Sequence, residues 1–469
     1  MTDASVPVSL ARLIGAAHVL TAPDATAPYY TDWVGRTSGA ALCVCRPGSV
    51  DEVAAIVRYC AGAAIPVFPQ GGNTSSTAGG IPLCGGRGVV LCLARLNKIE
   101  EVDTVSDAII VQAGCTLAQV QQAAKDHDRL FPLTLSSEGS CQIGGNVSTN
   151  AGGTAVLRYG NTRDLVLGIE AVLADGRIWN GLRTLRKDNA GYDMKSIFVG
   201  SEGTLGIVTR VALKLFPRQR QRAMAFVALP APQAAVDLLL TCRASFGAEL
   251  DAFELFSASQ LRIIAEHIPG VRLPFAALPD WALMIEVKGN AAFCELSGRL
   301  VDVLGGAMTS GLITNAVPAA TEAQANAFWH IRHSVSEANK QHGLNFTHDT
   351  AVPIVRVPDF LAAADAAVTQ AYPEATLHSV SHLGDGNVHF TAIFPHGQAG
   401  NAGNLGGEVA RLVHDIAVSM GGTFAAEHGI GQRYRDSLQR YKSPVELDLF
   451  RKLKTALDPQ GILNPGKVL

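Results

Sequence analysis

The sequence predicts an α+β protein with a glycine-rich N-terminal half and a C-terminal half built on an antiparallel sheet. Short apolar strands alternate with amphipathic helices in both halves, a pattern typical of mixed layers of sheet and helix. The 469 residues suffice for two or three domains. Loops of small residues gather before residue 217, whereas eleven of the thirteen histidines follow residue 260. The two halves are therefore expected to do different chemistry.

The composition argues against several classes of protein. The net charge is −3, with 38 basic and 41 acidic residues, whereas a nucleic-acid-binding protein carries a clustered basic excess. No apolar run reaches the ~18 residues of a membrane span. Residues 10–20 are read as a short amphipathic helix rather than a signal peptide. Nine cysteines without CxxC pairs predict reduced thiols and a cytoplasmic location.

The elements of the N-terminal half follow from apolar runs and capping signals. Ser49, followed three residues later by Glu52, forms a capping box that predicts a helix start. The predicted strands lie at 42–45, 65–68, 89–93, 108–112, 165–175 and 207–215, and the predicted helices at 49–60 and 117–127.

Three loops of small residues interrupt these elements. Loop 1 is PQGGNTS at 69–75, loop 2 spans 137–153, and loop 3 is VGSEGTLGIV at 199–208. Consecutive glycines let backbone N–H groups point into one concavity, which suits phosphate oxygens. Loop 1 matches neither a Walker A loop nor a G-x-G-x-x-G turn, and by itself it is more typical of an ordinary glycine-rich loop. Several separated loops of this kind suit a ligand with a pyrophosphate and an extended body.

The C-terminal half begins near PRQRQR at 217–222, a polar, proline-led boundary. Strands at 223–228 and 283–287 and a helix at 233–244 predict a cap with an antiparallel sheet. A further helix is predicted at 328–340. Glu254 and Glu286 fall in strand-like segments and are expected to be solvated or structural carboxylates rather than catalytic ones.

The stretch HLGDGNVH at 382–389 is the strongest functional signal. An Asp-Gly turn between His382 and His389 would let both imidazoles face one point. Glu427, in EHGIG at 427–431, offers a third ligand, and two His with one Glu form a catalytic metal set with a vacant position. The alternative is a hairpin with surface histidines. His428 would diverge from Glu427 in an extended segment, and its ordinary pKa of ~6.5 suits a general base.

Loops 1 to 3, RYG at 158–160, Arg163-Asp164 and the tail LDPQGILNPGK at 457–467 resemble the FAD-binding domain of the vanillyl-alcohol-oxidase/p-cresol-methylhydroxylase superfamily. The GDGN turn with both flanking histidines and EHGIG resemble its D-2-hydroxyacid dehydrogenase branch, which contains D-lactate and D-2-hydroxyglutarate dehydrogenases and the glycolate oxidase D subunit. The resemblance implies a two-subdomain FAD-binding domain of the p-cresol-methylhydroxylase type plus an α+β cap. The expected divisions are an N-terminal segment (1–37), the FAD-binding domain (38–217), the substrate domain (218–420) and a segment closing over the flavin (421–469).

The resemblance also implies which residues hold the cofactor. Loop 1 would hold the FAD pyrophosphate, loop 2 would line the ribityl path, and the start of the strand after loop 3 would meet the ring systems. The full set is Pro69, Gln70, Gly71, Gly72, Asn73, Thr74, Ser75, Pro132, Gly139, Ser140, Gly144, Gly145, Ser148, Asn150, Gly203, Gly206, Ile207 and Asn464. Non-covalent FAD is expected because no histidine lies between His18 and His127.

The resemblance implies that Arg332, in FWHIRH, binds a substrate carboxylate through its planar fork. The implied metal ligands are His382, His389 and Glu427. Thr347 stands where relatives carry a basic residue and Thr391 where they often carry Asn, and His348 is either a pocket residue or a structural one. The expected substrate residues are Arg332, Ser336, Thr347, His348, Thr391 and His428.

The activity implied is oxidation of a D-2-hydroxy acid (D-2-hydroxyglutarate, D-lactate or D-malate) to the 2-oxo acid. His428 would take the hydroxyl proton, the hydride would pass to flavin N5, and an electron-transfer flavoprotein, quinone or cytochrome would accept the electrons. Zinc is expected, with manganese as the alternative because such sites discriminate poorly. A homodimer is one expected oligomeric state. Two alternatives stay open: a non-catalytic or partner-dependent subunit of a glycolate-oxidase-like complex, and a metal-independent sugar or lactone flavin oxidase.

Overall fold

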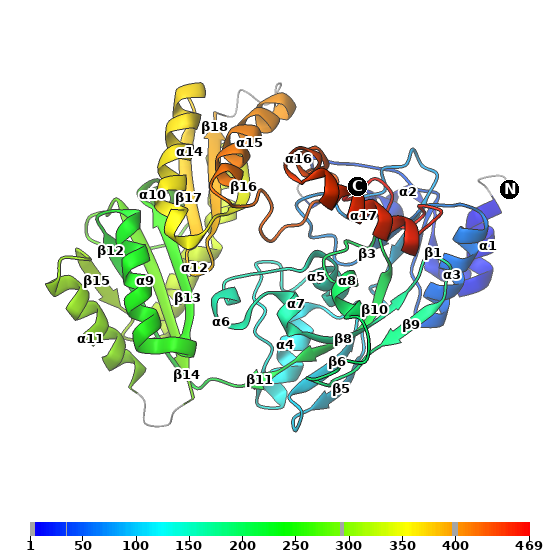
Figure 1. Ribbon diagram of the computed structural model, residues 1–469, viewed down its shortest axis with the longest axis horizontal. Helices are drawn as coiled ribbons and strands as arrows, with labels where there is room; N and C mark the ends of the chain where they lie inside the picture. Colours follow the sequence, from blue (N-terminus) through cyan, green and yellow to red (C-terminus); the bar gives the residue numbers. More distant parts are fainter. Residues whose placement is uncertain (1–4, 34, 291–294, 396–401) are drawn as a thin grey trace. The chain divides into compact units, whose positions relative to one another are not determined.

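The computed structural model describes residues 5–33, 35–290, 295–395 and 402–469 (Figure 1). The chain divides into two compact units. Unit 1 comprises Met1–Gly153, Tyr159–Arg218 and Glu427–Leu469, and unit 2 comprises Thr154–Arg158 and Gln219–Ala426. Both units combine helices with antiparallel sheets, which confirms the predicted α+β class.

Unit 1 contains two main sheets. The first is four-stranded, in the order β1 (Val19–Leu20), β2 (Cys43–Cys45), β4 (Val89–Cys92) and β3 (Val67–Gln70), with β2, β4 and β3 parallel. The second is antiparallel, in the order β5 (Ile99–Asp103), β6 (Ala108–Gln112), β10 (Ile207–Lys214), β8 (Val166–Val172) and β9 (Ile178–Gly181). Each sheet buries its own apolar core. Unit 1 thus has the two-subdomain construction that was expected for the FAD-binding domain.

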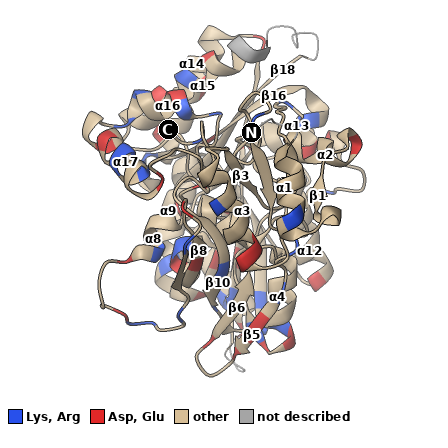
Figure 2. Cartoon of the chain, turned by 90° about the vertical axis from the view of Figure 1, so that its right-hand side faces the viewer, with Lys and Arg blue, Asp and Glu red and all other residues tan. Residues whose placement is uncertain are grey.

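Helices and short strands complete unit 1. They are α1 (Ser5–Ile14), η1 (Ala16–His18), α2 (Pro23–Tyr30), α3 (Val50–Gly62), α4 (Leu117–Asp126), β7 (Arg129–Leu130), α5 (Ile143–Thr149), α7 (Thr162–Leu165), α8 (Met194–Phe198), β11 (Phe216–Pro217), α16 (Arg435–Tyr441) and α17 (Pro444–Leu457). The predicted helix start is confirmed, because the Ser49 side chain accepts a hydrogen bond from Glu52 N. The reciprocal half of the predicted capping box differs, since the Glu52 carboxylate accepts from Gly48 N rather than from Ser49 N. Figure 2 shows basic and acidic residues on the same helices, such as α16 and α17, in line with the nearly balanced charge.

Unit 2 is built on one seven-stranded antiparallel sheet. Its order is β15 (Asn315–Pro318), β12 (Gln221–Leu229), β14 (Trp281–Gly289), β13 (Leu250–Ser257), β17 (Thr376–His382), β18 (Asn387–Phe394) and β16 (Leu344–Ala351). One face packs on α9 (Pro232–Phe246), α11 (Leu296–Thr309), α14 (Val357–Ala371) and α15 (Ala402–Ser419). The other face packs on α10 (Ala258–His267), α12 (Glu322–His333) and α13 (Val335–His342). The short elements are α6 (Val156–Tyr159), which ends in unit 1, η2 (Gly247–Glu249) and η3 (Ile354–Arg356).

Two features of unit 2 differ from the sequence-based expectation. The helix predicted at 328–340 is two helices, α12 and α13, that meet at Ser334. Strand β16 was not predicted, because polar residues such as Thr347, His348 and Asp349 leave it without an apolar run. The carboxylates of Asp251 and Glu254 in β13 and of Asp349 in β16 are buried, and this is possible only where the tertiary structure supplies partners.

Candidate active site

The three small-residue loops of unit 1 lie against one another. A Cβ added at Gly72 of loop 1 would stand 2.0 Å from the Ser140 carbonyl oxygen of loop 2. A Cβ at Gly203 of loop 3 would stand 2.5 Å from Cγ of Pro69, and Gly203 has a positive φ of 71° that favours glycine. The loops can therefore approach one another only with glycine at these two positions.

The polar side chains of loop 1 hold the loop itself. Gln70 Nε2 donates to the carbonyls of Tyr29 (2.9 Å) and Gly80 (3.0 Å). Asn73 Nδ2 donates to the Thr31 carbonyl at 2.8 Å, and Asn73 has a left-handed φ of 53°. Since both side chains are engaged within unit 1, a phosphate at this loop would be bound through backbone N–H groups.

Loop 2 leaves room beside its backbone. No described atom lies within 4 Å of a Cβ built at Gly139 or Gly145, whereas a Cβ at Gly144 would press against Ala113 at 2.7 Å. Backbone that is open on one side and packed on the other forms a cradle for a ligand. The other predicted cofactor residues lie in these loops or in the buried segments next to them: Gly71, Thr74, Ser75, Pro132, Ser148, Asn150, Gly206 and Ile207.

Unpartnered polar atoms give a test of whether FAD fits here. Buried polar atoms are normally hydrogen-bonded. Several buried atoms of unit 1 find no hydrogen-bond partner among the described residues: Gln142 Oε1, Asn146 Oδ1, Ser201 Oγ, Asn464 Oδ1 and Lys467 Nζ. The Lys467 ammonium could bind an anionic group of a ligand. The Ser201 hydroxyl and the amide oxygens could bind its polar groups. A ligand with phosphates, hydroxyls and a polar ring edge, such as FAD, fits this set.

The C-terminal tail contributes to the same loops. Asn464 Nδ2 donates to the carbonyls of Glu202 (2.7 Å) and Gly79 (3.0 Å). Lys467 is 2% exposed, and burial together with the nearby Arg435 lowers its pKa to about 8. A buried ammonium without an anionic hydrogen-bond partner is costly, so its position points to an anionic ligand.

Replacing Lys467 by methionine is expected to weaken FAD binding about 10–100-fold, the usual contribution of a hydrogen bond to a charged group. The thermal stability of the protein without FAD should not fall, because the substitution removes a buried unpaired charge. Release of flavin fluorescence on dilution of the holoprotein measures the affinity. Lys452→Met, on the exposed part of α17, is the matched control and should change nothing. Unaltered FAD affinity in the Lys467 variant would separate this lysine from the cofactor.

In unit 2, HLGDGNVH forms the hairpin between β17 and β18. The Asp385 carboxylate accepts a hydrogen bond from Asn387 N at 3.0 Å, and Gly386 turns the chain with a φ of 87°. A Cβ at Gly386 would stand 2.3 Å from the Val352 carbonyl oxygen, so no larger residue fits. The rings of His382 and His389 come to a centroid distance of 5.2 Å.

Ala426, the residue before Glu427, is held within unit 2. The amide of Ala426 donates to the backbone carbonyl (3.1 Å) and the carboxylate (3.2 Å) of the buried Asp349. One carboxylate oxygen of Glu427 and one ring nitrogen each of His382 and His389 lie within 4.8 Å of one another. Ligands on a tetrahedral zinc ion lie about 3.3 Å apart, from bond lengths of about 2.0–2.2 Å. Two imidazoles and one carboxylate at this spacing fit a catalytic metal.

A buried ion pair orients the first of these histidines. Glu254 is 1% exposed and accepts from His382 Nδ1 (2.7 Å) and Arg332 Nε (2.6 Å). Burial alone would raise the pKa of Glu254, but His382 and Arg332 outweigh it and lower the pKa to about 2. Arg332 also donates to His382 Nε2 at 3.1 Å, so that nitrogen carries a lone pair. The guanidinium thus occupies the direction in which a metal would bind.

Glu254 and Asp349 are the residues that sequence reasoning missed. Glu254 and Glu286 were expected to be either solvated or structural, and the solvated alternative is excluded because they are 1% and 0% exposed. Glu286 is structural, paired with Lys288 at 2.8 Å. Asp349 accepts from Asn387 Nδ2 at 3.0 Å and holds the segment before the Glu-His pair. The available signal was Glu254 between the apolar residues of AFELF at 252–256, whereas Asp349 lies in a polar stretch and gave none.

Two of the predicted substrate residues are brought together and two are not. Thr347 and Thr391 share a hydrogen bond of 3.0 Å between their hydroxyls, on the sheet face that carries His382 and His389. His348 points to the opposite face, where its ring is 5.5 Å from that of His414 on α15. Ser336 is exposed on α13.

His428 lies beside the metal-ligand candidate Glu427. Its Nε2 is 3.6 Å from a Glu427 carboxylate oxygen, and its side chain is 37% exposed. The following turn is anchored within unit 1, since the buried Glu202 carboxylate accepts from the amides of Ile430 and Gly431, each at 2.7 Å. Burial raises the pKa of Glu202, and these amides oppose the shift. The backbone after His428 is therefore held firmly.

Comparison with known proteins assigns the chain to a family. Residues 218–468 match the family described as FAD linked oxidases, C-terminal domain, and residues 41–181 match the one described as FAD binding domain. The chain belongs to the FAD-linked oxidases. It is an FAD-dependent oxidoreductase, which confirms the resemblance noted in its sequence.

Relatives of this FAD-linked oxidase align over nearly its whole length. The D-2-hydroxyglutarate dehydrogenase of Bos taurus, named as mitochondrial, is 36% identical and covers 96% of this chain and 81% of its own. The D-2-hydroxyglutarate dehydrogenase of Xanthomonas citri pv. viticola is 34% identical, with coverages of 100% and 97%. The D-2-hydroxyglutarate–pyruvate transhydrogenase of Saccharomyces cerevisiae is 30% identical, with coverages of 96% and 90%.

Solved structures confirm the fold of this oxidase. p-Cresol methylhydroxylase with bound substrate superposes with a TM-score of 0.76 at 17% identity, covering 99% of this chain and 96% of the other. An alkyldihydroxyacetonephosphate synthase gives the same TM-score at 17% identity, with coverages of 99% and 85%. Within the described part of the chain, no helix has the length and apolar character needed to cross a bilayer.

Proposed function

We propose that this FAD-linked oxidase oxidises a D-2-hydroxy acid to the 2-oxo acid with the help of a divalent metal, preferably zinc. The observation that carries the proposal is the group of His382, His389 and Glu427, whose ligand atoms lie within 4.8 Å of one another. The curated relatives named D-2-hydroxyglutarate dehydrogenases supply the substrate class. D-2-Hydroxyglutarate is therefore the first substrate to test, with D-lactate and D-malate next.

Each group of the site has a distinct role in this proposal. FAD supplies the two-electron acceptor of the reaction. A metal held by two imidazoles and one carboxylate would lower the pKa of a bound hydroxyl. His428 takes the hydroxyl proton as the general base. Arg332, whose Nε is held by Glu254, presents the rest of its guanidinium to the substrate carboxylate and orients the carbon that is oxidised.

The Arg332 contact with His382 also fits this proposal. In the structure, Arg332 donates to His382 Nε2, the nitrogen that would bind the metal. When that lone pair is coordinated, the same N–H is free to donate to a carboxylate instead. Metal and carboxylate binding are thereby expected to support each other. Thr347 and Thr391 offer neutral hydroxyls for the rest of the substrate, and they bear on which acid is preferred.

Anaerobic flavin bleaching tests the proposal. We expect one of the three D acids to bleach the flavin, its L form to leave the flavin oxidised, and a chelator to abolish bleaching until zinc is restored. Bleaching that survives chelation would favour the metal-independent oxidase. No bleaching by any of these acids, in a protein that retains FAD, would favour a partner-dependent subunit.

Arg332→Ala is expected to raise KM for the acid about 10–100-fold, since a hydrogen-bonded charge pair with the carboxylate is lost. Steady-state kinetics with the bleaching substrate measures this effect. Arg411→Ala, an exposed arginine on α15, is the control and should behave as wild type. An unchanged KM in the Arg332 variant would place the carboxylate grip elsewhere.

The electron acceptor and the location of the chain belong to the same proposal. An electron-transfer flavoprotein, a quinone or a cytochrome is proposed as the acceptor. Because the yeast relative is named a transhydrogenase with pyruvate, pyruvate is a further acceptor to test. The cytoplasmic location stays a prediction from the cysteine pattern, whereas the Bos taurus relative is named as mitochondrial. The homodimer likewise stays a prediction.

A further inference from the structure

A second group of metal-binding side chains lies in unit 2. His267 Nε2 and His342 Nδ1 are 2.9 Å apart, with ring centroids 5.1 Å apart. One carboxylate oxygen of Glu266 and one ring nitrogen of each histidine lie within 4.8 Å of one another. The neighbouring His378 has its ring 5.7 Å from that of His342 and precedes His382 by four strand residues, about 13 Å along β17. This group is therefore separate from the candidate active site.

The distances fit a metal with little rearrangement. Two ligands on a tetrahedral zinc ion lie about 3.3 Å apart, as follows from bond lengths of about 2.0–2.2 Å. The two ring nitrogens, now 2.9 Å apart in a hydrogen bond, would have to separate by only a few tenths of an ångström to reach that spacing. A small rotation of the two imidazoles would achieve this. Imidazole and carboxylate are ordinary zinc ligands, and a third ligand from Glu266 leaves one position for water.

The backbone around the two histidines also favours a cation. His267 is the last residue of α10, and His342 is the last residue of α13. The C-terminal end of a helix carries roughly half a negative charge, which attracts cations within its last turn. Two such ends converge here, and Glu266 adds a full negative charge.

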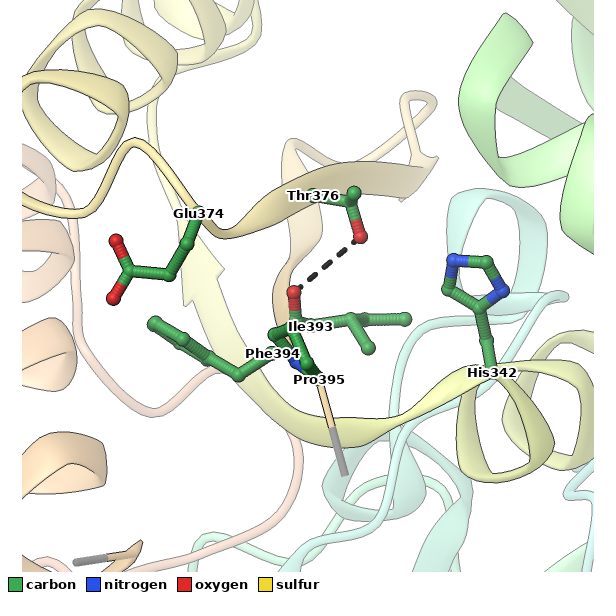
Figure 3. Close-up of a pocket in the computed structure, with 6 residues that line it drawn as sticks. All are labelled: His342, Glu374, Thr376, Ile393, Phe394 and Pro395. Atoms are coloured by element: carbon green, nitrogen blue, oxygen red, sulfur yellow. Dashed lines mark hydrogen bonds between the residues drawn. The ribbon is translucent and has the colours of Figure 1, made fainter. Parts of the chain in front are cut away.

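A solvent-accessible cavity reaches one of the histidines. It has a volume of about 160 Å³ and is lined by His342, Glu374, Thr376, Ile393, Phe394 and Pro395 (Figure 3). In Figure 3, His342 and Glu374 stand on opposite sides of the cavity, with Thr376 between them donating to the Ile393 carbonyl. The His342 ring can thus be reached from solvent without opening the core.

His378 shields this group on its buried side. It is 3% exposed, and its Nε2 is 3.1 Å from the Thr376 hydroxyl. Arg262 is a cation on α10, but its side chain is exposed to solvent, which screens it.

We propose that His267, His342 and Glu266 form a second divalent transition-metal site, of zinc-like preference, that links the C-terminal ends of α10 and α13. The proposed site is structural or regulatory rather than catalytic, and it does not depend on the proposed function. Its histidines are 75 positions apart in the sequence, so bound metal cross-links segments that only the fold brings together.

Zinc stoichiometry tests this proposal. Holoprotein without a histidine tag is dialysed against zinc, washed and analysed for metal and flavin. We expect two zinc ions per chain in the wild type and one in His267→Ala and in His342→Ala, with unchanged flavin content. Glu266 is exposed, so Glu266→Gln is not expected to disturb folding. This substitution should lower the zinc affinity of the second site at least tenfold. His127→Ala, an exposed histidine of unit 1, is the control and should keep two ions.

This experiment tests the two proposed metal sites separately. His382→Ala removes the ion of the candidate active site and should leave the ion at His267 and His342. A wild type with one ion that His267→Ala removes supports the second site and contradicts the catalytic one. Two ions retained in both the His267 and His342 variants, or a single ion lost only in His382→Ala, would overturn the proposal.

Discussion

Substitution of His428 by alanine should slow flavin reduction by the D-2-hydroxy acid about 10²–10⁴-fold, the usual contribution of a positioned general base. The His428 side chain is partly exposed beside Glu427. The following turn stays anchored, because Glu202 binds the amides of Ile430 and Gly431 rather than the imidazole. FAD content, zinc content and fold should therefore be retained. Anaerobic stopped-flow bleaching with saturating substrate isolates the chemical step.

Two comparisons show whether the lost rate belongs to proton removal. His428→Gln keeps a polar side chain without a titratable nitrogen and should be as slow as the alanine variant. His127 is exposed at the C-terminal end of α4, and His127→Ala should react at the wild-type rate. A near-wild-type rate in both His428 variants would remove this residue from the mechanism.

Glu254→Ala should cost the protein about 3–5 kcal/mol of folding free energy and lower its metal affinity about 10–100-fold. The stability loss arises because Arg332, with a side chain 13% exposed, keeps its charge but loses the carboxylate 2.6 Å away. The affinity loss arises because His382 Nδ1 loses the acceptor that fixes its ring and tautomer. Urea denaturation measures the first effect, and zinc competition with a chelator measures the second.

Glu286 provides a matched control on the same face of the same sheet. It is 0% exposed and paired with Lys288, but it has no contact with the candidate metal ligands in the described part of unit 2. Glu286→Ala should therefore lower stability to a similar degree while leaving zinc affinity unchanged. Equal loss of zinc affinity in both variants would mean that Glu254 acts only through the stability of unit 2. Glu254→Gln, which keeps an acceptor for His382, should recover part of the affinity.

The candidate site shows how far local sequence carries a prediction. The Asp-Gly turn that brings His382 and His389 together needs only contacts within eight residues, so the sequence was enough to anticipate it. The glycines of loop 1 likewise indicate a loop in which the backbone approaches its neighbours closely. The side chains of Gln70 and Asn73, by contrast, bind carbonyls of the segment before β2, and nothing in loop 1 indicates those partners.

Long-range strand pairing decided the rest. Glu254 and His382 are 128 positions apart, and they meet only because β13 pairs with β17 in the seven-stranded sheet. In the same sheet, Glu254 also accepts a hydrogen bond from Arg332, which lies 78 positions away in the sequence. His348 shows the converse, since period-two alternation in β16 turns it to the face covered by α15, away from Asp349.

The sequence by itself thus determined the α+β class, the FAD-linked family, the glycine-rich loops and the histidine hairpin, because these depend on residue type and short spacing. Only the tertiary structure decided which carboxylates are buried, which face each strand residue takes and that His267 meets His342. Those outcomes depend on strand order and helix packing. They reflect the free energy of burying charges with partners distant in the chain, which no local pattern encodes.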